Sequence, residues 1–153
     1  DTPEIPIVFV GRKGDDISYV DDVMSLSALR GNVYFFDEVP HENIQMFYKN
    51  AKVHVLASFR ESPGLVTLEA LGQGCNVVVS GYDFCPVKYY KFEENAYICN
   101  PYSISSIRKN ILSAISDITP VSIGKDYFLY YNYETSAKIT YDTYNALVNP
   151  LKM

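Results

Sequence analysis

One stretch of the sequence gathers side chains that can bind a charged, hydroxyl-rich ligand. Glu61 and Glu69 lie eight positions apart, and Pro63 and Gly64 stand between them, before an apolar segment that begins at Leu65. A carboxylate accepts hydrogen bonds from adjacent hydroxyl pairs, such as those of a ribose or a hexose. The two glutamates therefore indicate a ligand with sugar hydroxyls, although the dipole of a helix start by itself also favours acidic residues.

The same stretch predicts a helix start that binds an anion. Pro63 and Gly64 interrupt regular structure, so we expect the helix to begin at about Leu65. Its first backbone N–H groups, around Gly64, Leu65 and Val66, lack partners within the helix and carry the positive end of its dipole. Such an end binds phosphate, and a glycine without a Cβ lets the phosphate come close. An acidic protein can thus hold an anionic nucleotide without a broad basic surface.

Composition excludes several classes of protein. The chain has 153 residues, with 13 Lys plus Arg against 18 Asp plus Glu, and 48% of its residues are apolar. The apolar content excludes disorder, and no run approaches the roughly 20 apolar residues of a membrane span. The net charge of -5 argues against binding to nucleic acid. Cys75, Cys85 and Cys99 have neither disulfide nor metal spacing, so we expect buried, reduced thiols in a cytoplasmic protein and no metal site.

The elements that position the glutamates follow from short apolar runs that alternate with helical periods. Strands are predicted at residues 7–10, 33–36, 53–56, 77–79 and 97–99. Helices are predicted at 19–29 after an N-cap at Ser18, at 42–49, at 65–73 before Gly74, and after an N-cap at Ser103 or Ser105. This order predicts a Rossmann-like, doubly wound parallel α/β sheet, whose ligands bind at the carboxyl ends of the strands.

The predicted domain is a single unit over residues 1–153. Residues 1–117 form its α/β core, and residues 118–153 hold an irregular, Tyr-rich segment up to residue 133 and a closing helix at 134–148. The apolar positions of that helix indicate that it packs on the outside of the domain.

The stretch from Glu61 to Gly74, followed by the strand around residues 76–80, resembles the signature of the retaining glycosyltransferases of family 4, also called group 1. In that family two glutamates separated by seven residues enclose a Gly-Leu turn, and a Val-rich strand follows. The resemblance extends outward to residues 7–14, 32–39, 51–58 and 133–144, and so covers nearly the whole chain.

The resemblance implies the C-terminal, donor-binding half of a two-lobed GT-B enzyme. Glu61 is then the catalytic position beside the anomeric centre, and Glu69 binds the ribose. The remaining implied donor-binding residues are Ser62, Gly64, Leu65, Val66, Gly11 and Arg12. The family implies neither a metal nor a cofactor, and the donor is a nucleotide-diphosphate sugar.

Some positions depart from the family pattern. The family has an earlier βα unit with an Arg and a Lys that clamp the diphosphate, and this chain lacks it; Arg12 and Lys13 lie in a loop at the same edge without matching that pair. Asp37 replaces a usual glycine, and residues 81–86 lack paired glycines before Pro86. The chain begins at Asp1 without Met, so we expect an excised piece whose N-terminal acceptor domain is absent, and which is inactive alone.

The leading functional prediction is therefore a hexosyltransferase-type enzyme of surface polysaccharide or glycoconjugate synthesis. It moves a sugar from the nucleotide donor to a saccharide or lipid-linked acceptor, and peripheral attachment to the inner membrane face is left open for the longer protein. One alternative is a GT-B-type sugar-nucleotide epimerase. Another is a non-catalytic α/β binding or interaction module, which the Tyr-rich residues 127–133 suggest because tyrosine is enriched at interfaces.

Overall fold

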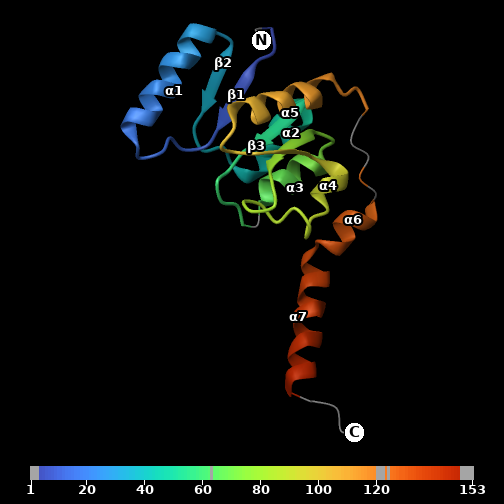
Figure 1. The fold of residues 1–153 in the computed structure, drawn as a ribbon. Coiled ribbons are helices and arrows are strands. Elements are labelled where there is room, and N and C mark those ends of the chain that lie inside the picture. Colours follow the sequence, from blue (N-terminus) through green and yellow to red (C-terminus); the bar gives the residue numbers. More distant parts are fainter. Residues whose placement is uncertain (1–3, 63, 120–122, 124, 149–153) are drawn as a thin grey trace. The chain divides into compact units, whose positions relative to one another are not determined.

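The computed structural model describes residues 4–62, 64–119, 123 and 125–148 (Figure 1). It divides the chain into two compact units, Asp1–Met46 and Phe47–Met153, and each is described by itself. The single domain over residues 1–153 therefore stays a prediction.

The first unit contains a pair of parallel strands. Strands β1 (Ile7–Val10) and β2 (Val33–Phe36) pair with Ile7 opposite Val33, and helix α1 (Ile17–Arg30) connects them. The N-cap of α1 is Asp16, whose carboxylate accepts a 3.1 Å hydrogen bond from the Tyr19 amide. The predicted cap at Ser18 is wrong, because Ser18 already lies inside the helix. Helix α2 (His41–Asn50) leads into the second unit.

The second unit is built on a sheet of three parallel strands in the order β3, β4, β5. These are β3 (Val53–Leu56), β4 (Asn76–Ser80) and β5 (Tyr97–Cys99). Every residue of β4 is buried, as expected for the middle strand of a covered parallel sheet. Helix α3 (Leu65–Gly72) connects β3 to β4, the short α4 (Phe92–Asn95) precedes β5, and α5 (Ile104–Ser116) follows it. The Asn76 side-chain amide donates to the Ala114 carbonyl at 2.9 Å and so joins β4 to α5.

The predicted Rossmann-like α/β class is confirmed, since the strands within each sheet pair in parallel and helices alternate with them. The hydrogen bonds that the structure describes divide the strands into a pair and a triplet, where the sequence suggested one sheet. The N-cap of α5 is Ser103, one of the two predicted candidates, and its side chain accepts from the Ser106 amide.

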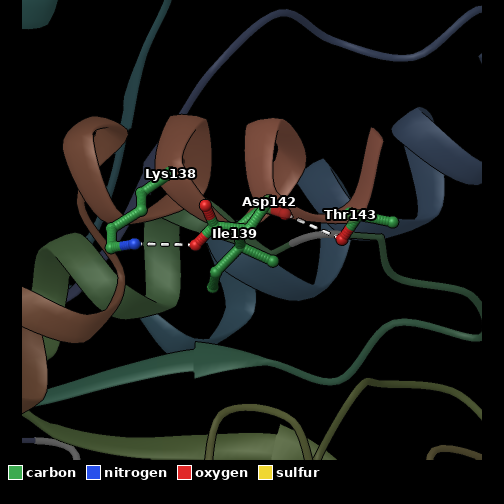
Figure 2. Close-up of polar contacts among 4 residues, drawn as sticks. All are labelled: Lys138, Ile139, Asp142 and Thr143. Carbon is green, nitrogen blue, oxygen red and sulfur yellow. Dashed lines mark hydrogen bonds and ion pairs between the residues drawn. The ribbon is translucent and has the colours of Figure 1, made fainter. Parts of the chain in front are cut away.

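The C-terminal region is more helical than predicted. Helix α6 (Lys125–Tyr130) lies within the segment that was expected to be irregular, so that expectation is wrong. Helix α7 (Tyr133–Val148) forms close to the predicted bounds, but its predicted packing on the outside of the domain is not seen, since none of its residues is buried and the side chain of Leu147 is 73% exposed. Instead of packing on the domain core, α7 has contacts along its own length. Figure 2 shows the ion pair of Lys138 with Asp142 at 2.7 Å and the hydrogen bond from the Thr143 hydroxyl to the Ile139 carbonyl.

The cysteines behave as apolar packing residues. Cys75, Cys85 and Cys99 are all buried and free of disulfide bonds, as the spacing predicted. Burial raises the pKa of each of the three thiols, which disfavours the thiolate that a nucleophile would need. Among the helices of the described part of the chain, none is both long and apolar enough to cross a membrane.

Candidate functional site

The site predicted from the sequence centres on the start of α3, at the carboxyl end of β3. The helix begins at Leu65, as predicted, and Gly64 is its N-cap, with φ 73° and ψ 38° in the left-handed region. The Thr67 amide donates to the Gly64 carbonyl at 3.0 Å and closes the first turn. Gly64 has no side chain with which to cap this end. Its first amides are therefore available to an anion, as at other helix starts.

Gly64 also makes room for Glu61. A Cβ at position 64 would lie 3.1 Å from the Cγ of Glu61, closer than such contacts normally are. The Glu61 side chain thus lies directly against the backbone of the helix start. Glycine is needed here for two reasons, the positive φ and this close approach.

Neighbouring strand ends hold Glu61 in place. Its backbone amide donates to the Phe84 carbonyl at 2.7 Å, and its carboxylate accepts from the Ser58 hydroxyl at 3.2 Å. The carbonyl of Ser58 in turn accepts a 2.6 Å hydrogen bond from the hydroxyl of Ser80, the last residue of β4. Burial raises the pKa of the Cys85 thiol to about 11, and the negative charge of the Glu61 carboxylate adds to this increase. The half-buried Glu61 is thus fixed from two strands.

Glu69 lies one turn farther along α3 and has a hydrogen-bond donor that the sequence did not reveal. The hydroxyl of Tyr48, on α2, donates to the Glu69 carboxylate at 3.4 Å. Tyr48 is buried, and its carbonyl accepts from the Cys75 thiol at 2.8 Å. Burial, together with the Glu69 charge and this hydrogen bond, raises the pKa of Tyr48 to about 12. Tyr48 is therefore a protonated donor to Glu69 at neutral pH.

The surface beside the helix start is open and partly apolar. Ser62 is exposed, and the side chains of Leu65 and Val66 are 54% and 41% exposed. Three aromatic side chains that follow the ends of β3, β4 and β5 form a cluster next to Glu61. The ring of Tyr102 lies 4.7 Å from that of Phe59 and 5.5 Å from that of Phe84, between centroids. The sequence reasoning missed this cluster, for which the only signal was an aromatic residue shortly after each of three strands.

Two polar side chains of the same region are buried without a hydrogen-bond partner in the described structure. They are the hydroxyl of Thr67, in the first turn of α3, and the Nε2 atom of His54, on β3. Burial lowers the pKa of His54 to about 4, so its imidazole is neutral at neutral pH. Its ring packs edge-on against Tyr48, with centroids 5.7 Å apart. His54 thus supports the residue that holds Glu69.

The structure brings together six of the predicted site residues and leaves two in the other unit. Glu61, Ser62, Gly64, Leu65, Val66 and Glu69 lie along one loop and helix of the second unit. Gly11 and Arg12 lie in the first unit, where Gly11 donates to the Phe36 carbonyl at 3.0 Å and Arg12 is exposed. Their approach to the glutamates stays a prediction.

Chemically, the arrangement offers one anion-binding helix start between two oriented carboxylates. Glu69 lies four positions after Leu65, which corresponds to about 6 Å along a helix axis. An ionised carboxylate accepts about four hydrogen bonds, so a single hydroxyl partner does not use the acceptor capacity of such a group. A phosphate at the helix start would thus have one hydroxyl acceptor in the preceding loop and another in the second turn of the same helix.

Comparison with known proteins gives a consistent result. The model of the family "Glycosyl transferases group 1" matches residues 1–125. The chain is 29% identical over 140 residues to an uncharacterized glycosyltransferase of Methanocaldococcus jannaschii, covering 88% of this chain and 36% of that protein. It is 25% identical over 112 residues to the O-antigen chain mannosyltransferase B of Escherichia coli, covering 73% of this chain and 29% of that protein. The chain thus spans about a third of the length of these relatives.

A solved structure shares the fold. Sucrose-phosphate synthase from Thermosynechococcus elongatus superposes with a TM-score of 0.75 at 21% identity, over 98% of this chain and 41% of that one. The likeness shows the Rossmann-like α/β arrangement found in GT-B glycosyltransferases.

Proposed function

The chain belongs to the group 1 glycosyltransferases, and on this premise we propose that its second unit binds the nucleotide-diphosphate sugar of a retaining, metal-independent transferase. The assignment to family 4, and to the C-terminal half of a GT-B enzyme, is part of the same proposal. The observation that carries it is the pair of carboxylates, each held by a hydroxyl, of which Glu61 precedes the helix start at Gly64 and Glu69 lies in the second turn of the helix.

In this proposal each part of the site has one task. The amides near Gly64, Leu65 and Val66, with the exposed Ser62, face the donor phosphates. Glu69, held by Tyr48, accepts hydrogen bonds from the ribose hydroxyls. Glu61, held by Ser58, accepts them from the transferred sugar, beside the anomeric carbon. The helix dipole stabilises the negative charge that develops on the leaving diphosphate, without a metal or a further cofactor.

The whole reaction needs more than this chain. The proposed acceptor is a saccharide or a lipid-linked saccharide, held by an N-terminal domain of a longer protein. Synthesis of a surface polysaccharide or glycoconjugate is the proposed setting, and the name of the Escherichia coli relative, an O-antigen chain mannosyltransferase, supports it. We accordingly propose that the chain alone is inactive, and that the longer protein works in the cytoplasm or at the inner membrane face. Gly11 and Arg12 stay proposed donor-binding residues.

The test is substitution of Glu69 by alanine in the longer protein. We expect the variant to lose about 1–3 kcal/mol of donor binding, since paired hydrogen bonds from the hydroxyls to a charged group are removed. Donor affinity and turnover are measured together, and NMR of the product reports whether the anomeric configuration is retained. The matched control is Glu42→Ala, which removes a glutamate from the first turn of another helix, α2.

Equal donor affinity and turnover in the Glu69→Ala and Glu42→Ala variants would refute the role of Glu69. Inversion of the anomeric centre would refute the retaining mechanism. Alteration of the donor sugar without any acceptor would instead identify an epimerase.

A further inference from the structure

We propose that this chain has a second saccharide-binding site, which shares no residue with the loop that carries Glu61 and Glu69. The site is a pocket of about 750 Å³ between helix α6 and the segment that runs through the turn before α4 and α4 itself. Its lining includes Lys88, Tyr89, Lys91, Glu94, Asp126 and Tyr130. Its volume lies within the range of about 300–1,000 Å³ that is usual for small-ligand sites.

The walls of the pocket are aromatic and held in place. The Tyr127 hydroxyl donates to the Tyr90 carbonyl at 2.7 Å, and the Tyr131 hydroxyl donates to the Tyr89 carbonyl. These bonds join α6 and the residue after it to the turn before α4. The side chains of Tyr89 and Tyr130 are nevertheless 60% and 54% exposed. Both of these rings pack edge-on against the ring of Tyr131. Their exposed parts give a sugar ring an apolar surface to pack on, beside a polar edge.

The polar groups of the pocket match a neutral, hydroxyl-rich ligand. Lys88 and Lys91 supply hydrogen-bond donors, and Glu94 and Asp126 supply acceptors. Two positive and two negative groups balance, so the lining does not favour a phosphate or another polyanion. Sugar hydroxyls use donors and acceptors at once, and this mixture suits them better than it suits a nucleotide.

The backbone at Lys91 supports a role for its side chain. Its φ is 51°, and Lys91 is one of two non-glycine residues with positive φ in the described chain, the other being Asn32. The fully buried Phe92 anchors the turn, with its amide donating to the Val87 carbonyl at 2.9 Å. Glycine would adopt this backbone without strain, and strained residues gather at ligand sites. The strained backbone thus occurs at a lysine whose side chain lines the pocket.

The choice of a saccharide among hydroxyl-rich ligands rests on the proposed function, because a glycosyltransferase handles glycan chains. The proposed ligand is a neutral oligosaccharide, bound by residues outside the loop that carries Glu61 and Glu69. Its binding at α4 and α6 is a property separate from nucleotide binding at α3, and the two are measured separately.

The experiment titrates the full chain with neutral trisaccharides of glucose, mannose and galactose while NMR follows the tyrosine ring signals. We expect at least one trisaccharide to shift the signals of Tyr89 and Tyr130. The variants Tyr130→Ala and Lys91→Gly should bind it at least about fivefold more weakly, which is about 1 kcal/mol. Glycine adopts the left-handed backbone at position 91 without strain, so weaker binding by Lys91→Gly is not caused by misfolding. The matched control, Asn32→Gly, relieves the other positive φ and should bind as the unsubstituted chain does.

The proposal is overturned if none of the trisaccharides shifts these signals, or if both pocket variants bind as tightly as the Asn32→Gly control. It is also overturned if inorganic pyrophosphate shifts them and the saccharides do not. Glu69→Ala separates the two sites, because it should weaken nucleoside diphosphate binding and leave the trisaccharide affinity unchanged. Trisaccharide binding without any nucleotide binding would contradict the proposed function and support the second site.

Discussion

At the scale of single residues, the two glutamates were visible in the sequence but their partners were not. The spacing of Glu61 and Glu69 around Gly64 pointed to a ligand site, because few residue types accept paired hydroxyls or allow such a turn. Tyr48 lies 21 residues before Glu69, in the helix predicted at 42–49, and nothing in the local sequence links the two residues. Ser58 and Ser80 are joined through the pairing of β3 with β4. Contacts of this kind depend on how the strands lie beside one another, which no local pattern reveals.

Gly64 is the residue whose substitution should separate backbone strain from site geometry. Gly64→Ala places a Cβ 3.1 Å from the Glu61 side chain and forces a left-handed alanine. We expect unfolding free energy to fall by about 1–2 kcal/mol, and nucleotide affinity to fall with it. Gly74→Ala is the matched control, since Gly74 has φ 85° and open space around it. Denaturant unfolding and calorimetry measure both quantities; equal nucleotide affinity in the two variants would contradict the role of the Glu61 contact.

His54 should make the stability of the second unit depend on pH. Its folded pKa is about 4, below the unfolded value of about 6.5, so folding favours the neutral imidazole. The contribution is complete above pH about 6.5 and is lost as the pH falls toward 4, by about 3 kcal/mol in total. His54→Phe keeps a ring against Tyr48 and should flatten this part of the curve. Denaturant unfolding at several pH values checks it, with the exposed His41→Asn as control; an unchanged slope in His54→Phe would contradict the assignment.

At the scale of elements, boundaries with a strong local signal were predicted well. Helix α3 begins at Leu65, because a left-handed glycine ends the preceding turn, and α5 begins after the Ser103 cap. The start of α1 was misplaced because Asp16 and Ser18 are both good caps, and only the structure shows which side chain accepts the Tyr19 amide. Helix α6 was missed because its six residues, rich in tyrosine, are too short to show a helical period.

Asp16, the observed N-cap of α1, and Ser18, the predicted one, can be compared by substituting each with alanine. Asp16→Ala removes the acceptor of the Tyr19 amide and should lower the free energy of unfolding of the first unit by about 1 kcal/mol. Ser18→Ala, inside the helix, should change it by no more than about 0.5 kcal/mol, because alanine is the better helix former. Far-UV circular dichroism during denaturant unfolding measures both; a larger loss in Ser18→Ala would show that Ser18 is the cap.

At the scale of the whole molecule, the class of fold followed from the alternation of apolar runs with helical periods, and the parallel pairing of all five strands confirms it. The sequence could not show that these strands form a pair and a triplet in two units, because apolar runs do not specify which strands pair. It also could not show that α7 keeps its apolar side chains exposed, since amphipathic spacing is the same whether or not a partner surface is present. Six of the predicted site residues lie in the second unit, so substitutions there test donor binding independently of the first unit.

The most direct test of donor binding at the start of α3 is an NMR titration of the full chain with uridine, guanosine and adenosine diphosphates. We predict that at least one of them binds, and that the backbone amide signals of Gly64, Leu65 and Val66 shift the most. The Glu69→Ala variant should need a higher concentration for the same shifts, since it lacks the acceptor for the ribose hydroxyls. If these three amides do not shift with any of the three nucleotides, or if others shift while these stay in place, the helix start is not the phosphate site.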